Sequence, residues 1–121
     1  MSYKSNWDTA YQQDPETKLL IDHLSVNAPF GQKTIVNLPA AYRTAIARNQ
    51  IVFLGGRLVY YEAISVAIKY ICRIIVPSSL RHKFFNLMHT TPVAGHMGEY
   101  KILYRIQLRF FWPRMRSDIK V

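Results

Sequence analysis

The spacing of apolar residues predicts helices in the first part of the chain. Residues 14–24 are typical of a helix start followed by an apolar stripe. Asp14 can cap the first turn, and Pro15 is favourable at the first helical position because the N–H that proline lacks would have no partner within the helix there. A second short helix is predicted after Pro39, where apolar residues recur at helical spacing. Residues 1–13 are polar with scattered aromatics and have no clear period, so we expect a loose arm there.

The middle of the chain changes to the pattern of strands. The runs 51–54 and 57–62 are rich in β-branched and aromatic residues and flank Gly55-Gly56, which predicts a hairpin because its turn needs positive φ angles. A third strand is predicted over residues 67–76, where apolar residues occupy the even positions. This alternation predicts that Cys72 points to the more buried face, as a core residue.

Helical spacing returns after Pro77, with further helices predicted after Gly98 and at Trp112-Pro113. The pattern therefore predicts an α+β fold in two parts. In residues 1–76, a small three-stranded antiparallel sheet packs on helices. In residues 77–121, a small helical subdomain follows.

Charge is distributed unevenly along the chain, whose formal net charge is +9. Residues 1–66 hold six basic and five acidic groups, whereas residues 67–121 hold ten basic and two acidic groups, so the net charges of the two parts are +1 and +8. A polyanion such as DNA or RNA is the expected partner of this basic protein. The alternative is a basic surface that only interacts with solvent. The predicted nucleic-acid-binding residues are Lys101, Arg105, Arg109, Arg114 and Arg116, with no acid between the first and the last.

Two histidines lie on either side of a predicted loop that contains Pro92 and Gly95. His89 and His96 could converge on one point and form half of a zinc site, since structural zinc is commonly held by two His and two Cys. The alternative is a pair of surface or helix-capping histidines without a metal. Cys72 is the only cysteine, which excludes an internal disulfide and fits a reducing, intracellular compartment. No apolar run is long enough to span a bilayer, so we expect no membrane contact.

Several short motifs together resemble a known family. The resemblance is to the N-terminal region of integrases from gypsy-type LTR retrotransposons and their retroviral relatives, and it is densest over residues 57–121. The motifs that carry it are Leu58-Val-Tyr-Tyr61, Arg73-Ile-Ile-Val-Pro77, Leu80-Arg81, His89 and His96 with six residues between them, Met97-Gly98, Lys101, Phe111-Trp112-Pro113-Arg-Met115 and Asp118-Ile119.

The resemblance implies a transposable-element protein that takes part in DNA integration. It implies that residues 1–76 resemble an N-terminal extension, and that His89 and His96 are the first two ligands of a His-His-Cys-Cys zinc site in a bundle related to helix-turn-helix domains. The family's Cys pair would lie beyond Val121, so we expect zinc binding by this chain to be weak or absent. The catalytic core would lie outside the chain too, which implies a non-catalytic fragment.

The implied partners are DNA, the integrase catalytic core and other integrase subunits, in the nucleus or in virus-like particles. Two alternatives stay open at this point. One is a protein-interaction domain that derives from a retroelement and no longer binds nucleic acid. The other is a metal-dependent hydrolase built on His89, His96 and Glu99, for which the basic half offers too few carboxylates.

Overall fold

A computed structural model of the chain describes residues 3–25, 35–62, 71–84, 86 and 98–119. Three helices precede the sheet: α1 (Tyr3–Gln13), α2 (Pro15–Ser25) and α3 (Ala40–Ala47). The helix predicted from Asp14-Pro15 is confirmed, and the backbone N–H of Glu16 donates to Asp14 Oδ1 at 3.0 Å, as an N-cap requires. The helix predicted after Pro39 is confirmed as α3.

The loose arm predicted for residues 1–13 is wrong, because Tyr3–Gln13 form α1. Tyr11 is buried and Trp7 packs partly buried against the same core, one helical turn away, with their ring centroids 5.8 Å apart. These two rings lie on one face of α1, so contact with the rest of the fold stabilises a helix whose own sequence lacks a regular apolar stripe.

The sheet has the strand order β1-β2-β3-β4. Strands β1 (Ile51–Leu54), β2 (Arg57–Glu62) and β3 (Ile71–Ile75) are antiparallel, as predicted, and Gly55 and Gly56 form the hairpin turn with φ angles of 59° and 79°. The predicted count of three strands is wrong, since β4 (Phe110–Phe111) adds a fourth strand parallel to β3. A strand of two residues has no alternation that sequence reasoning could detect.

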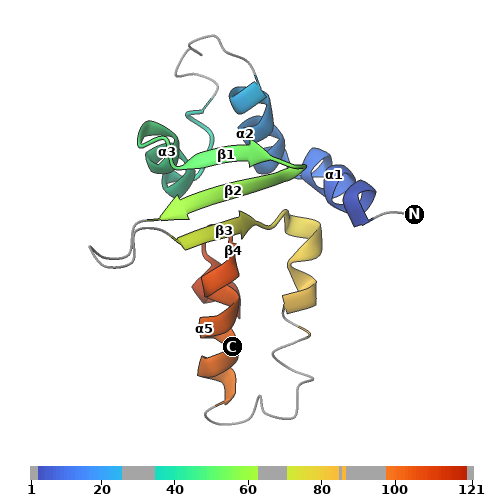
Figure 1. Ribbon diagram of the computed structural model, residues 1–121, viewed down its shortest axis with the longest axis vertical. Coiled ribbons are helices and arrows are strands. Elements are labelled where there is room, and N and C mark those ends of the chain that lie inside the picture. Colours follow the sequence, from blue (N-terminus) through green and yellow to red (C-terminus); the bar gives the residue numbers. More distant parts are fainter. Residues whose placement is uncertain (1–2, 26–34, 63–70, 85, 87–97, 120–121) are drawn as a thin grey trace.

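The two faces of the sheet contribute to two apolar cores. Helices α1 to α3 pack on one face, where Tyr11, Leu20, Tyr42, Leu58 and Ile75 are buried together. The second core consists of Val76, Ile106, Trp112 and Met115. Figure 1 shows the sheet between these groups, with α1 to α3 at one end of the molecule and α5 (Gly98–Arg109) at the other.

Cys72 does not lie on the more buried face, so that prediction is wrong. Its side chain is exposed, whereas Ile75, which points to the opposite face, is fully buried. Partners across the sheet share a face, and Ile75 pairs with Phe111 of β4, which also packs against the core under α1 to α3. On the face that Cys72 shares, side chains become buried only at Val76, just after β3, where the second core begins.

A tyrosine hydroxyl connects α1 to the sheet. The Tyr11 hydroxyl donates to the backbone oxygen of Ile75 at 2.7 Å and accepts from the backbone N–H of Leu58 at 3.1 Å. The paired register of β2 and β3 ends at Val59 and Ile74, so the hydroxyl bridges the two strands one residue beyond their ladder.

The boundary predicted between residues 76 and 77 falls inside a set of shared hydrogen bonds. The N–H of Val76 donates to the Phe111 oxygen at 3.0 Å, and β4 pairs with β3. Residues on both sides of the boundary therefore contribute to one sheet, and the division into subdomains 1–76 and 77–121 stays a prediction.

Candidate nucleic-acid interface

Helix α5 presents an apolar side to the second core and basic residues to solvent. Ile106 is buried against that core, whereas Arg105 and Arg109, one turn apart, are exposed. The predicted basic ridge is therefore present at these two positions. Lys101 belongs to α5, but its side chain lies outside what the structure describes.

Two more of the predicted basic residues lie just after β4. Arg114 and Arg116 are both exposed, and Arg114 has a positive φ of 63° at the turn into α6 (Met115–Ile119). The buried Trp112 fixes this turn, because its Nε1 donates to Asp118 Oδ2 at 2.9 Å. Asp118 thus directs its carboxylate to the indole of Trp112.

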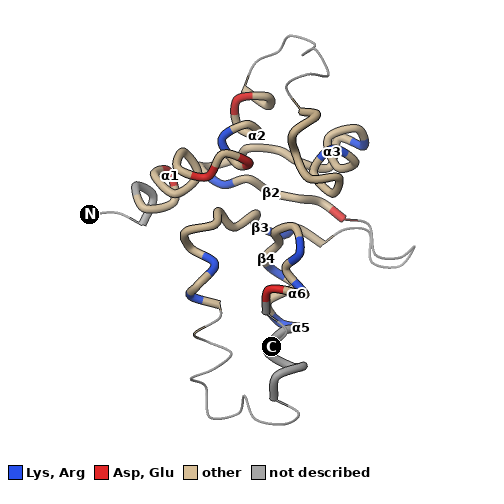
Figure 2. The backbone as a smooth tube through the Cα atoms, turned by 180° about the vertical axis from the view of Figure 1, so that it is seen from behind, with Lys and Arg blue, Asp and Glu red and all other residues tan. Residues whose placement is uncertain are grey.

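The exposed arginines keep their charge available to a partner. Within the described residues, ion pairs form between Arg73 and Glu62 at 3.0 Å and between Arg81 and Asp14 at 3.7 Å. No ion pair in that part of the chain involves Arg105 or Arg109 of α5, Arg114 at the turn before α6 or Arg116 of α6, which together are termed the α5–α6 arginines. Figure 2 shows acidic positions gathered on α1 and α2, with basic positions prevailing in the half that contains β3, α5 and α6.

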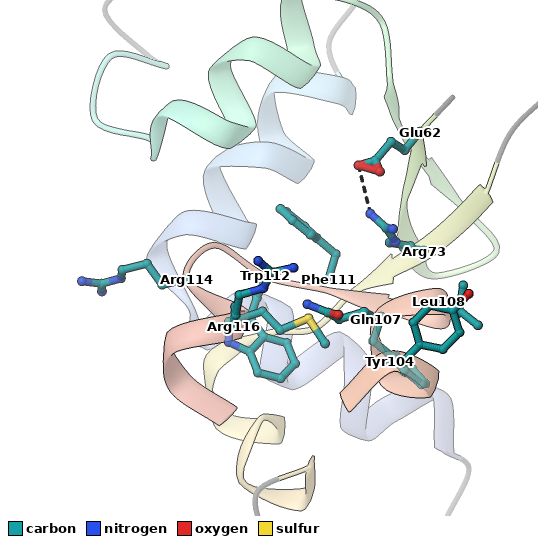
Figure 3. Close-up of a pocket in the computed structure, with 11 residues that line it drawn as sticks. Glu62, Arg73, Tyr104, Gln107, Leu108, Phe111, Trp112, Arg114 and Arg116 are labelled. Carbon is teal, nitrogen blue, oxygen red and sulfur yellow. Dashed lines mark hydrogen bonds and ion pairs between the residues drawn. The ribbon is translucent and has the colours of Figure 1, made fainter. Parts of the chain in front are cut away.

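A cavity of about 420 Å³ lies beside these arginines, and sequence reasoning did not predict it. Its walls come from strands β2 and β3, from α5, and from the segment that runs through β4 into α6. Figure 3 shows the Glu62–Arg73 ion pair on one wall, Gln107 between Arg73 and Arg116, and Arg114 extending away from the cavity. The full lining is Glu62, Arg73, Tyr104, Gln107, Leu108, Phe110, Phe111, Trp112, Arg114, Met115 and Arg116.

A buried polar cluster anchors the start of the C-terminal segment to the α1–α2 junction. Asp14 Oδ2 accepts the N–H of Ser78 at 2.9 Å and faces the Arg81 guanidinium. Arg81 also donates from Nε to the Val76 oxygen at 3.0 Å, and its guanidinium lies 5.5 Å from the Trp112 ring centroid. The sequence showed Asp14 only as a helix cap, because its second role needs a residue 64 positions away.

The predicted zinc ligands His89 and His96 lie outside the described residues. The described residues contain no group of three or more His, Cys, Asp or Glu side chains that could hold a metal ion. His82, the histidine that precedes them, is exposed, and its Nδ1 lies 2.8 Å from the Ser79 oxygen. The part of the chain that is described therefore offers no zinc site, and the assignment of His89 and His96 stays a prediction.

No helix in the described ranges combines the length and the apolar character needed to cross a membrane. In comparison with known proteins, residues 76–121 match the family model of the integrase zinc binding domain. Neither the curated proteins nor the solved structures yielded a match.

The matched segment contains His89, His96 and all five predicted nucleic-acid-binding residues. It begins at Val76, next to the contacts that Asp14 makes with Ser78 and Arg81. The resemblance to an integrase N-terminal region is thereby confirmed, while a gypsy-type origin stays a prediction. In integrases this domain is a non-catalytic N-terminal part. Residues 76–121 of the chain are similar to the integrase zinc binding domain, which supports an N-terminal integrase region.

Proposed function

We propose that the chain is a non-catalytic N-terminal part of a retrotransposon integrase that binds nucleic acid and helps integrase assembly. In this proposal the phosphate backbone of DNA, or of RNA, lies along the exposed arginines of α5 and α6. The proposal also implies a location in the nucleus or in virus-like particles, where an integrase meets DNA.

The carrying observation is a set of exposed cations that have no acidic partner in the described part of the chain. Arg105, Arg109, Arg114 and Arg116 all belong to the segment that matches the integrase domain. Arginine suits phosphate because its planar guanidinium can donate two parallel hydrogen bonds. In this proposal the arginines contact the phosphate backbone rather than base edges, so we expect binding that depends weakly on sequence and strongly on salt.

The test is the salt dependence of binding to a labelled DNA duplex, measured by fluorescence anisotropy. Each phosphate contact that is lost should lower the magnitude of the log–log salt slope by about 0.7–0.9. The double variant Arg105→Glu with Arg109→Glu should therefore lower both the affinity and this slope.

A matched control makes the same charge change at the other end of the molecule. Arg43 and Arg48 are exposed at α3, away from the matched segment, and can be changed to Glu together. The control should lose much less affinity than the α5 variant. Equal losses would show that only the net charge matters, and an unchanged slope in the α5 variant would show that the assigned face is wrong.

Assembly is the second part of the proposal, and an exposed apolar surface on the hairpin supports it. Val52 and Leu54 are 37% and 64% exposed, and both lie on the face of β1 opposite to the first core. We propose that this face contacts another integrase subunit or the catalytic core.

Sedimentation velocity over a range of concentrations tests the subunit contact. If the chain associates through this face, Leu54→Lys should shift it toward monomer, and added salt should weaken the association much less than it weakens DNA binding. A chain that stays monomeric at every concentration does not assemble with itself through the hairpin. A chain that associates but binds no nucleic acid would favour the protein-interaction alternative.

A further inference from the structure

The cavity beside α6 has a size and a lining that the proposed phosphate contacts do not use. Its volume of about 420 Å³ lies in the range of about 300–1,000 Å³ that is usual for sites of small molecules. Apolar and aromatic residues supply much of the lining, and a few polar side chains converge on it. Such a composition is typical of a site that binds one ligand group in a defined orientation.

The charges of the lining are arranged asymmetrically. Arg116 provides an exposed cation at the α6 end, whereas the opposite wall carries the Glu62–Arg73 pair, whose atoms are 3.0 Å apart. A phosphate would be attracted to the α6 end, because the opposite wall has no net charge where Arg73 balances Glu62. The Glu62 carboxylate can instead accept a hydrogen bond from an exocyclic amino group of a nucleobase. A nucleotide has both ends, an anionic phosphate and a base edge with donors, so it matches both walls.

An exposed aromatic ring lies at the edge of the same cavity. Tyr104 is 63% exposed and lines the cavity, so its ring is accessible to a ligand. It lies one residue before Arg105 on α5, and Leu108 of the cavity lies one residue before Arg109. The basic ridge therefore runs beside the cavity mouth, and a backbone that follows the ridge brings its bases within reach of Tyr104.

From this geometry we infer that the cavity binds an unpaired nucleotide of the nucleic acid held by the α5–α6 arginines. The phosphate lies at Arg116, the base stacks on Tyr104, and Gln107 hydrogen-bonds between them. A base inside a duplex cannot reach such a site, because both of its faces are stacked. This inference rests on the proposed function and adds to it a preference for single-stranded DNA or for frayed ends.

The experiment measures the affinity of the full chain for a labelled single-stranded 20-mer DNA and for the blunt duplex of the same sequence, at one fixed salt concentration. Tyr104→Ala should weaken single-strand binding by about 5- to 150-fold, the range seen when a base loses its aromatic stacking partner. The same variant should leave duplex binding unchanged, because the duplex contacts only the ridge. Circular dichroism of each variant checks that the fold is kept.

Three matched variants separate stacking from other effects. Tyr104→Phe keeps the ring and should restore single-strand binding. Val36→Ala truncates a residue of similar exposure that is not part of the cavity lining and should change neither affinity. Arg116→Gln should weaken single-strand binding more than duplex binding.

The outcomes are distinguishable. If neither DNA form binds, the proposed function fails. If both forms bind but Tyr104→Ala changes them equally or not at all, the proposed function stands and the cavity inference is overturned. If an oligoglutamate peptide fills the cavity as well as the single strand does, in competition at equal charge, the cavity is a general anion site and the inference is overturned too.

Discussion

The Tyr11 hydroxyl offers the clearest test of how the N-terminal helix is attached to the sheet. Replacing Tyr11 by Phe removes only the oxygen and keeps the ring, which packs at 5.8 Å from Trp7 and at 6.5 Å from Phe53. The change leaves the N–H of Leu58 and the carbonyl of Ile75 without this partner, and both residues are fully buried. Any loss of stability can therefore be assigned to hydrogen bonding.

The size of the loss follows from those two groups. A buried donor left without a partner costs about 1–3 kcal/mol, and a carbonyl that loses one of its acceptor bonds costs less, about 0.5–1.5 kcal/mol. The Phe ring no longer has to bury a hydroxyl, which offsets part of this cost. We expect a net decrease of about 2–3 kcal/mol in the free energy of unfolding, or about 8–12 °C in Tm for a domain of this size.

Tyr42→Phe is a matched control with the same chemical change. Tyr42 is also fully buried, but its hydroxyl has no hydrogen-bond partner among the described residues. Removing that hydroxyl should leave the free energy of unfolding unchanged or raise it by up to about 1 kcal/mol. Urea denaturation followed by circular dichroism measures both variants, with equal m-values as the check that the denatured states are comparable. Equal losses in the two variants, or a loss below about 0.5 kcal/mol for Tyr11→Phe, would refute the assignment to the bridging hydroxyl.

The remaining predictions concern pH, the buried aspartate, the hairpin turn and zinc. Burial raises the pKa of Tyr11 to about 12 and also raises the pKa of Tyr42. Because the protonated phenols are favoured in the folded state, their stabilising effect is complete below about pH 10 and is lost as pH rises toward about 12. The free energy of unfolding should therefore fall from about pH 9 to about pH 11, and less steeply in Tyr42→Phe. Asp14→Ala should lower stability by about 3 kcal/mol in urea denaturation, because the Ser78 N–H and the helix cap both lose their acceptor, whereas Asp14→Asn should cost about 1 kcal/mol since it keeps the cap. Gly56→Ala should cost about 1–2 kcal/mol through its φ of 79°, and Gly56→Asn less, by the same assay. Because Cys72 is the only cysteine, the chain lacks the cysteine pair of the implied zinc site, and a chelator should shift Tm by only about 1–2 °C; a large drop, or one tightly bound zinc per chain by metal analysis, would contradict this.

The sequence by itself determined the features that depend on residues close to one another. Asp14-Pro15 starts α2 because capping acts within one turn, and Gly55-Gly56 forms the hairpin because positive φ is a property of single residues. The exposed arginines of α5 could be predicted for the same reason, since helical spacing alone separates Arg105 and Arg109 from the apolar side. The integrase resemblance also came from short motifs, and the family match over residues 76–121 confirms it.

Tertiary structure decided what depends on contacts between distant residues. Helix α1 forms because Trp7 and Tyr11 find a core that later segments provide, and β4 exists only because β3 offers an edge to Phe110 and Phe111. Cys72 is exposed because side chains on its face of β3 become buried only at Val76, where the second core begins. The alternation of residues within β3 could not show which of its two faces would be packed. The cavity likewise needs β2, β3, α5 and α6 to meet, and residues up to 54 positions apart supply its walls. Local patterns fix local geometry, but burial is a property of the whole packed chain.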